Sequence, residues 1–380
     1  MAAISSYETN ELREETIMEQ RVIITQNFQN DLAMALVECE RDRIFVLTDE
    51  NTHAKCWPLL SNFYGLKQAQ IITIPAGDDN KSIEQLAYVW QKLGEGGATR
   101  HSCLINLGGG MVTDLGGFAA STFKRGINFI NIPTTLLAMV DASVGGKTGI
   151  NFGGLKNEVG VFSDSKFVIL NADFLSTLDK ANLLSGYAEM LKHGLIANEQ
   201  MWAELTTFDI AGEHTVWQRL QRMVADSVRV KEQVVAADPH EKGLRKALNL
   251  GHTFGHAFES WSYGFEEQAT KTKEHGRQPL LHGYAVAFGL IAELYLSVVK
   301  CGFPTEQMRQ TVSFIRQHYG NLPITCDDYD NIIALMRHDK KNRGTDINVT
   351  LLAGIGQLRI DQTIDEELIR EALDFVREDF

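Results

Sequence analysis

The sequence predicts two lobes: an α/β N-terminal lobe built on a parallel sheet and a mainly α-helical C-terminal lobe. In the first half, short apolar runs rich in β-branched residues alternate with helix-like stretches. After about Leu178 the pattern changes to long amphipathic segments. The length of 380 residues also exceeds the ~100–200 residues usual for one domain. We therefore expect a first domain over residues 1–178 and a second over residues 179–380.

The strands expected in the first domain are short apolar runs. They are RVIIT at 21–25, IFVLT at 44–48, QIITI at 70–74, CLINL at 103–107, NFINI at 128–132 and KFVIL at 166–170. Segments with helical periodicity lie between most of them, for example residues 82–97. A crossover helix between successive strands makes neighbouring strands parallel. This alternation is typical of a Rossmann-like, nucleotide-binding lobe.

The second domain is expected to be helical, with one extended segment. Its amphipathic segments cover residues 180–206, 214–236, 243–263, 281–300, 304–319, 328–338 and 364–378. Only residues 348–360 again read as extended. Residues 262–280 are polar and aperiodic, which predicts a surface loop.

Charge and hydropathy disfavour several classes of protein. The formal net charge of −13 argues against nucleic acid or an anionic membrane as the main partner. No run approaches the ~18 uninterrupted apolar residues of a transmembrane helix. The acidic N-terminus also lacks the apolar core of a signal peptide, so a cytoplasmic protein is expected.

The five cysteines are scattered along the chain, and none forms a CxxC pair. An odd number without close spacing argues against both a disulfide framework and a thiolate zinc site. We expect reduced and mostly buried thiols.

A first glycine cluster, NLGGGMVTDLGG at 106–117, follows an apolar strand and opens a helix-like stretch. Glycines at such a junction let backbone N–H groups approach a phosphate at a helix N-terminus, where the helix dipole also favours an anion. The string is not GxGxxG. From the residues alone it fits either a nucleotide phosphate site or a plain tight turn.

A second cluster, residues 132–157, gathers hydroxyl, acidic, basic and amide side chains in a glycine-rich loop. GGKT at 145–148 resembles the end of a P-loop, but Asp141 and Ala142 stand where the upstream glycine of GxxxxGK[ST] would be. We therefore expect no Walker A site. Lysine in such a loop, at Lys147 or Lys156, suits a phosphate or carboxylate better.

A metal site is indicated by histidines in the second half. His252 and His256 lie four residues apart, so both would point from one face of a helix, as paired metal ligands often do. Alone, this spacing also fits a capping or core histidine. His282 before an apolar helix and Glu189 in a glycine-bounded helix start favour the metal interpretation. One carboxylate with two imidazoles leaves open positions on a zinc-like ion for substrate oxygens.

Together these motifs resemble 3-dehydroquinate synthase, within the sugar phosphate cyclases and, distantly, the metal-dependent glycerol-type dehydrogenases. The resemblance runs from about residue 44 to residue 345 in the family's order. Its motifs are LTDENT, PAGDDNKS, NLGGGMVTDLGGFAASTFKRG, IPTTLLAMVDASVGGKTGIN, LKN, GYAEMLKHG, DPHEKGLRKALNLGHTFGHAFE, LHGYAVA and DKKN. As a combination they are highly specific.

The resemblance implies a metal site, an NAD site and a substrate site. The metal, zinc in most relatives with cobalt as an alternative, would be bound by Glu189, His252 and His282. NAD would contact Asp49, Asn51, Gly77, Lys81, Gly108, Gly109, Gly110, Asp114, Thr134, Thr135, Lys156, Phe174 and Thr177. Substrate would contact Arg125, Asp141, Lys147, Asn157, Lys231, Arg245, Asn249, His256 and Lys340. The catalytic residues would be His256, Glu241, Lys147 and Lys192.

Several positions depart from the family pattern. Tyr284 stands where a glutamate is expected after HG, Asp78 replaces another glutamate, and FGGLKN at 152–157 replaces the common PxGKN. None of these changes removes a metal ligand or a basic anchor. Arg125 matches an arginine that reaches the neighbouring subunit's site, which implies a functional homodimer.

The implied reaction converts 3-deoxy-D-arabino-heptulosonate 7-phosphate into 3-dehydroquinate and phosphate, a carbon–oxygen lyase step of the shikimate pathway to aromatic amino acids. Phosphate would leave by β-elimination, with His256, Glu241 or the phosphate's own oxygen relaying the proton.

The choice of a carboxylate-bearing substrate depends on Lys231 and Arg245. From the residues alone, Lys231 fits a solvated helix face, and Arg245 fits site and surface equally. The alternatives are another sugar phosphate cyclase, an NAD-dependent polyol dehydrogenase, and an inactive relative that serves as a binding subunit.

Overall fold

The structure, a computed structural model, describes residues 20–39, 41–153, 155–210, 212, 217–272, 279–337 and 347–378, with the backbone alone for 265–272. Contacts divide these residues into two compact units. The sheet unit comprises residues 20–179 and 217–232, and the helical unit comprises 180–212 and 233–378, with the gaps named above. Residues 217–232 thus group with the sheet unit. A single boundary at residue 178 does not allow for a later segment that belongs to the first unit.

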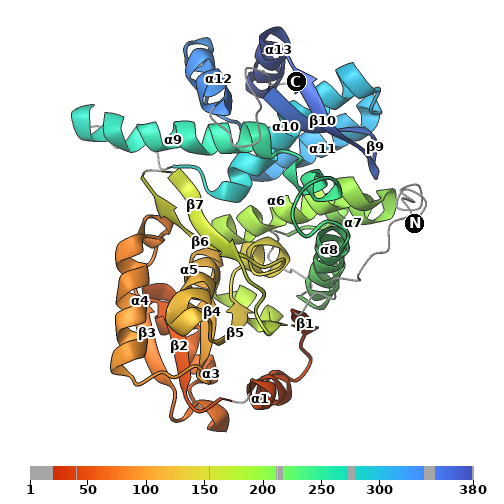
Figure 1. The fold of residues 1–380 in the computed structure, drawn as a ribbon. Coiled ribbons are helices and arrows are strands. Elements are labelled where there is room, and N and C mark those ends of the chain that lie inside the picture. Colours follow the sequence, from red (N-terminus) through yellow and green to blue (C-terminus); the bar gives the residue numbers. More distant parts are fainter. Residues whose placement is uncertain are drawn as a thin grey trace. The chain divides into compact units, whose positions relative to one another are not determined.

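A six-stranded sheet organises the sheet unit, in the order β1-β8-β5-β4-β2-β3. Figure 1 labels all of its strands except β8. Its strands are β1 (Arg21–Ile24), β2 (Ile44–Asp49), β3 (Gln70–Ile74), β4 (Cys103–Gly108), β5 (Asn128–Pro133) and β8 (Phe167–Leu170). Every neighbouring pair is parallel. The predicted parallel sheet is confirmed, and each strand starts and ends within about one residue of its predicted range.

The helices of the sheet unit are α1 (Phe28–Glu38), α2 (Glu50–Lys55), α3 (Trp57–Leu60), α4 (Ile83–Glu95), α5 (Gly110–Thr122) and the first part of α8 (Trp217–Ala237). Alternate residues of β2 and β3, such as Phe45 and Ile72, form one buried cluster with α4 and α5. Leu86, Val89 and Leu93 of α4 join this cluster at helical spacing. This core holds the carboxyl ends of the strands in fixed positions.

A hairpin replaces part of the loop predicted at 132–157. β6 (Lys147–Phe152) and β7 (Leu155–Phe162) pair antiparallel, with Gly149 opposite Gly160. A Cβ atom on Gly160 would lie 2.1 Å from the Thr148 carbonyl oxygen. The glycines that suggested a loop therefore permit close approach of two strands, so the loop prediction is wrong for residues 147–152 and 155–157.

Helices and one hairpin form the helical unit, which confirms the mainly helical prediction. They are α6 (Lys180–Ala197), α7 (Glu199–Thr207), the end of α8, α9 (His252–Thr272), α10 (His282–Cys301), α11 (Thr305–Tyr319), α12 (Tyr329–Arg337), α13 (Glu366–Arg377), β9 (Ile347–Gly354) and β10 (Gln357–Ile364). The predicted helix 180–206 is divided at Asn198, whose side chain caps α7 by accepting from the Met201 N–H at 2.9 Å. The extended segment 348–360 is a turn with two strands, because Gly356 adopts φ +75°.

The surface loop predicted at 262–280 is wrong over its first part, because α9 continues to Thr272. Residues 266–271 are EEQATK, and most of these are good helix formers without being apolar. A helix whose first turns are buried can therefore continue through a segment that lacks periodic apolar residues. Residues 273–278 lie outside the described part of the chain.

α10 is the central helix of the helical unit. It contacts α6, α9, α11, α13 and β9. Among the described residues it is the one helix long and apolar enough to cross a membrane, but 67% of its most apolar window is buried inside the protein. Its apolar composition is therefore explained by packing.

We expect Gly289→Ala to destabilise the protein by about 2 kcal/mol, because overpacking typically costs 1–3 kcal/mol. A Cβ atom at Gly289 would lie 2.0 Å from the Gly251 carbonyl oxygen, where backbone must move. The matched control is Gly264→Ala in α9, whose Cβ would meet nothing within 4 Å. It should stabilise by about 0.5–1 kcal/mol through helix propensity. Urea unfolding measures both, and equal effects would contradict the packing argument.

Candidate active site

Glu189, His252 and His282 converge in the helical unit. Glu189 lies within α6, and the histidines are the first residues of α9 and α10. Glu189 Oε1 is 3.4 Å from Nε2 of His252 and 3.4 Å from Nε2 of His282. Ligand atoms on adjacent corners of a tetrahedron with bonds of ~2.1 Å lie about 3.4 Å apart. These separations therefore match those of ligands around a zinc-sized ion.

The hydrogen bonds of this cluster also fit a cation. His282 Nδ1 donates to Glu259 Oε2 at 3.1 Å, and His252 Nδ1 donates to the Leu250 carbonyl at 3.1 Å. A neutral imidazole protonated at Nδ1 presents a lone pair at Nε2, so in that state both rings could offer a ligand atom beside the Glu189 carboxylate. Both carboxylate oxygens of Glu189 are buried, and they face the Lys192 ammonium and the two imidazoles. A divalent metal would satisfy these three groups together.

Electrostatics sets the protonation of the cluster. Burial alone would raise the pKa of Glu189, but the Lys192 ammonium and the two imidazoles hold it well below its usual range. Burial lowers the pKa of His252 to about 4, with Lys192 adding to the effect. Burial would also lower the pKa of His282, but Glu259 and Glu189 raise it to about 10. Metal binding must therefore displace a proton from His282.

His256 lies beside the cluster without joining it. Its ring centroid is 5.3 Å from that of His252 and 6.0 Å from that of His282. His256 is not a member of the group formed by Glu189, His252 and His282, whose ligand atoms all lie within 4.8 Å of one another. His256 is thus adjacent to the cluster.

Arg245 and Asn249 lie on the 3₁₀ helix η6 (Leu244–Asn249), which packs against α6 and leads to α9. Arg245 is buried, and its Nη1 donates to the Pro239 carbonyl at 2.6 Å, so it is not a surface arginine. Asn249 Nδ2 donates to Glu241 Oε1 at 2.9 Å. Glu241 itself adopts φ +57°. Lys340 lies outside the described residues.

Most of the predicted NAD residues lie at the carboxyl edge of the parallel sheet. Asp49 ends β2, Gly77 follows β3, Gly108 ends β4 and Thr134 follows β5. The chain reverses direction across the sheet between β2 and β4, because β3 lies on one side of β2 and β4 on the other. Ligands of open α/β sheets bind at such a switch point.

The glycine turn forms an open helix N-terminus. Gly109 caps α5, and no side chain accepts from the N–H groups of its first turn. A Cβ atom at Gly108 would lie 2.5 Å from Val112 Cβ, so the turn requires glycine there. Free N–H groups and the helix dipole make this end suited to a phosphate.

A buried cation lies next to this turn. The Lys81 ammonium contacts the carboxylate of Asp114 on α5 and the amide oxygen of Asn157 on β7. Lys81 is 4% exposed. Burial raises the pKa of Asp114, and the Lys81 charge opposes this rise. Asn157 holds its position with φ +51° and a backbone N–H that donates to Asn151 Oδ1 at 3.0 Å.

A second buried lysine lies on α8. The Lys231 ammonium contacts both the side chain and the carbonyl of Asp141. Lys231 is 6% exposed, so the alternative of a solvated helix face is wrong. Lys156 pairs with Asp78 at 3.1 Å, and Lys147 begins β6 with an exposed side chain.

Three predicted NAD residues also make local structural contacts, and a fourth is exposed. The Phe174 ring is buried and meets Phe28 edge-on at 6.0 Å, so it presents no surface to a ligand. Thr177 Oγ1 donates to the Phe174 carbonyl at 2.7 Å. Thr135 Oγ1 accepts from the Ala138 N–H at 3.1 Å, and Asn51 is exposed on α2.

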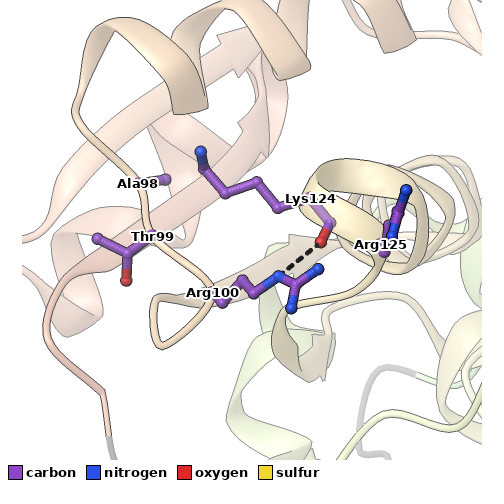
Figure 2. Close-up of a pocket in the computed structure, with 5 residues that line it drawn as sticks. All are labelled: Ala98, Thr99, Arg100, Lys124 and Arg125. Carbon is purple, nitrogen blue, oxygen red and sulfur yellow. Dashed lines mark hydrogen bonds between the residues drawn. The ribbon is translucent and has the colours of Figure 1, made fainter.

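Arg125 lies away from the carboxyl edge of the sheet. It lines a surface pocket with Ala98, Thr99, Arg100 and Lys124, where Arg100 Nε donates to the Lys124 carbonyl at 3.2 Å (Figure 2). The 13 residues of α5 separate it from the glycine turn. A helix of that length spans about 20 Å. Arg125 is therefore remote from the glycine turn of its own sheet unit.

Comparison with known proteins gives a consistent result. Residues 71–185 match the family described as 3-dehydroquinate synthase N-terminal, and residues 186–342 match 3-dehydroquinate synthase C-terminal. A 3-dehydroquinate synthase of Parabacteroides distasonis is 50% identical over 362 residues, 95% of this chain and 99% of the relative. The chain belongs to the 3-dehydroquinate synthase family.

Solved structures of two synthases with other names share the fold. A 2-deoxy-scyllo-inosose synthase complexed with carbaglucose-6-phosphate, NAD+ and Co2+ is 21% identical, with a TM-score of 0.75 and coverage of 93% of this chain and 95% of that one. A 2-epi-5-epi-valiolone synthase from Streptomyces hygroscopicus with NAD+ and Zn2+ bound is 22% identical, with a TM-score of 0.75 and coverage of 97% and 99%. At this identity the likeness concerns the fold.

Two buried glutamates near the cluster, Glu259 of α9 and Glu293 of α10, were not predicted from the sequence. Each contacts the start of the other helix. Each had a signal in the sequence. Glu259 follows His252 by seven residues, which places it on the same helix face, and Glu293 is the one acidic residue in the apolar run HGYAVAFGLIAELYLSVVKC.

We expect Lys81→Met to destabilise the protein by about 3 kcal/mol near pH 7.5, since removing one partner of a buried pair leaves an unpaired charge. The folded state already raises the pKa of Asp114, so folding favours its protonated form and this group's contribution to stability falls as pH rises. Without Lys81 the pKa rises further, so the deficit should shrink at pH 5.

Urea unfolding at the two pH values measures this difference. The control is Lys92→Met, whose partner Glu95 is exposed, and which should change stability little at either pH. A pH-independent deficit in Lys81→Met would contradict the assignment of the pair.

Proposed function

We propose that this chain is a 3-dehydroquinate synthase that converts 3-deoxy-D-arabino-heptulosonate 7-phosphate into 3-dehydroquinate and phosphate with NAD and a divalent metal, zinc by preference. The observation that carries the proposal is the convergence of Glu189, His252 and His282 on one point beside His256. Membership of the family and 50% identity with a 3-dehydroquinate synthase support the same reaction. The elimination of phosphate makes it a carbon–oxygen lyase reaction.

The two cofactors would be held by different units. Glu189, His252 and His282 would bind the metal, and the open N-terminus of α5 with Asp49 and Asp114 would bind NAD. When bound, NAD supplies reversible hydride transfer and the metal supplies Lewis-acid activation of a substrate hydroxyl. Homology to structures with NAD+ and Zn2+ or Co2+ bound supports this choice, and the native metal stays a prediction.

The chain's own residues would bind the charged ends of the substrate and move protons. Arg245, buried in η6, would supply a forked donor for a carboxylate or phosphate. Lys231 and Lys147 would add point charges. Asn249 would be held by Glu241, and His256 or Glu241 would take the proton released during elimination. The cytoplasmic location stays a prediction.

We expect one phosphate to be released per heptulosonate phosphate, without lasting NADH absorbance, and a chelator should abolish the reaction. The reason is that hydride is removed and then returned within one turnover. Accumulating NADH would support a polyol dehydrogenase, and turnover of sedoheptulose 7-phosphate instead would support another cyclase. His282→Ala should lose bound metal and turnover together, whereas His101→Ala, an exposed control in the sheet unit, should keep both. No phosphate release at all would favour an inactive relative.

A homodimer in which Arg125 completes the partner's site is a further part of the proposal. Its position at the far end of α5 supports this role. Arg125→Ala and Glu189→Ala should each be inactive alone. After the two are mixed and allowed to exchange subunits, about one quarter of wild-type activity should return, because half of the dimers are mixed and each carries one intact site. No recovery in verified mixed dimers would contradict action across the dimer.

A further inference from the structure

α9 and α10 each carry a buried glutamate that contacts the other helix. Glu259 of α9 is 4% exposed, and Glu293 of α10 is fully buried. Neither residue contributes to the group of converging metal-ligand atoms. A buried carboxylate is costly unless it is hydrogen-bonded or paired, so the partners of these two residues indicate their role.

Glu259 contacts a metal ligand across the helix pair. Its Oε2 accepts from His282 Nδ1 at 3.1 Å, and His282 begins α10. This contact fixes which ring nitrogen carries the proton and leaves Nε2 facing Glu189. Its negative charge also makes Nε2 a stronger electron donor.

Glu293 of α10 contacts the start of α9. Its two oxygens accept from the Gly251 N–H at 2.6 Å and from the Thr253 N–H at 3.2 Å. These N–H groups flank His252 at the start of α9, where helix N–H groups lack partners within the helix. A carboxylate from α10 thus replaces a local capping residue and holds the backbone of the other ligand.

Glycines set the register that makes both contacts possible. A Cβ atom on Gly289 would lie 2.0 Å from the Gly251 carbonyl, and one on Gly255 would lie 3.1 Å from the Ala285 carbonyl. Because 251 meets 289 and 255 meets 285, the two helices run in opposite directions past each other. This register also brings Glu259 to His282 and Glu293 to the residues around His252.

We propose that Glu259 and Glu293 form a reciprocal carboxylate clamp, in which each ligand helix is positioned by a glutamate of the other, and that this clamp sets metal affinity. Both are positioning residues, since they act through His282 and His252. The inference rests on the proposed metal site. Outer carboxylates of this kind typically change metal affinity by about 10- to 100-fold when they are removed.

The test measures zinc affinity of the metal-free full chain by competition with a chromophoric chelator, together with the visible spectrum of the Co2+-loaded protein. Glu259→Gln and Glu293→Gln keep side-chain volume and remove charge. Both should bind zinc about 10- to 100-fold more weakly and shift the cobalt spectrum. The matched control is Glu371→Gln, which removes an exposed carboxylate that accepts from Tyr295 of α10 at 3.1 Å and should leave both readouts unchanged.

Wild-type zinc affinity and cobalt spectrum in Glu259→Gln would overturn the proposal, even if thermal stability fell, because that pattern is expected of a purely structural residue. If Glu293→Gln does not fold, Glu259→Gln decides alone, since its amide oxygen can still accept from His282. Glu189→Ala separates the two levels of inference. If it retains zinc, the proposed metal site fails; if it loses zinc while both glutamine variants match wild type, only the clamp fails.

Discussion

A carboxylate with no exposed surface lies at the centre of the helical unit, and the arrangement around it follows from the need to neutralise its charge. The oxygens of Glu189 face the Lys192 ammonium and two imidazoles. An unpaired buried charge would cost several kcal/mol in a protein interior. The helices that bring the ammonium and the imidazoles to this point are therefore under a common electrostatic constraint. Glycines such as Gly283 and Gly289 let α6, α9 and α10 approach closely enough to meet it.

The fold was predictable where one physical pattern dominates. The parallel strands are continuous apolar runs because both faces of such a sheet are buried, and these runs stand out from the helical segments between them. The hairpin at 147–162 was not predictable in the same way. Its glycines fit close strand pairing and loops equally, and only the partner strand distinguishes them. The extension of α9 to Thr272 was missed because polar helix formers carry no apolar period.

The candidate site divides similarly. Histidine spacing predicted a cluster, but the roles of His252 and His256 depended on Glu189 and His282, which lie 63 residues before and 30 residues after His252. The positions of Lys231 and Arg245, in a site or on the surface, were ambiguous because a sequence does not show which basic side chains are buried. Both side chains are buried. Glu259 and Glu293 carried a signal in their positions, but a single acid in an amphipathic or apolar helix does not show what it contacts. Burial and partners, which only the fold supplies, give these residues their meaning.

The opposed register of α9 and α10 has a consequence for anyone who wishes to transplant this site into another scaffold. A ligand and the glutamate that orients it never lie on the same helix, because Glu259 contacts His282 and Glu293 contacts the backbone around His252. Neither helix is thus a self-contained module. The smallest part that could be transplanted is the helix pair with its glycine contacts. A graft of HTFGHAFE alone would carry His252 without Glu293 and Glu259 without His282.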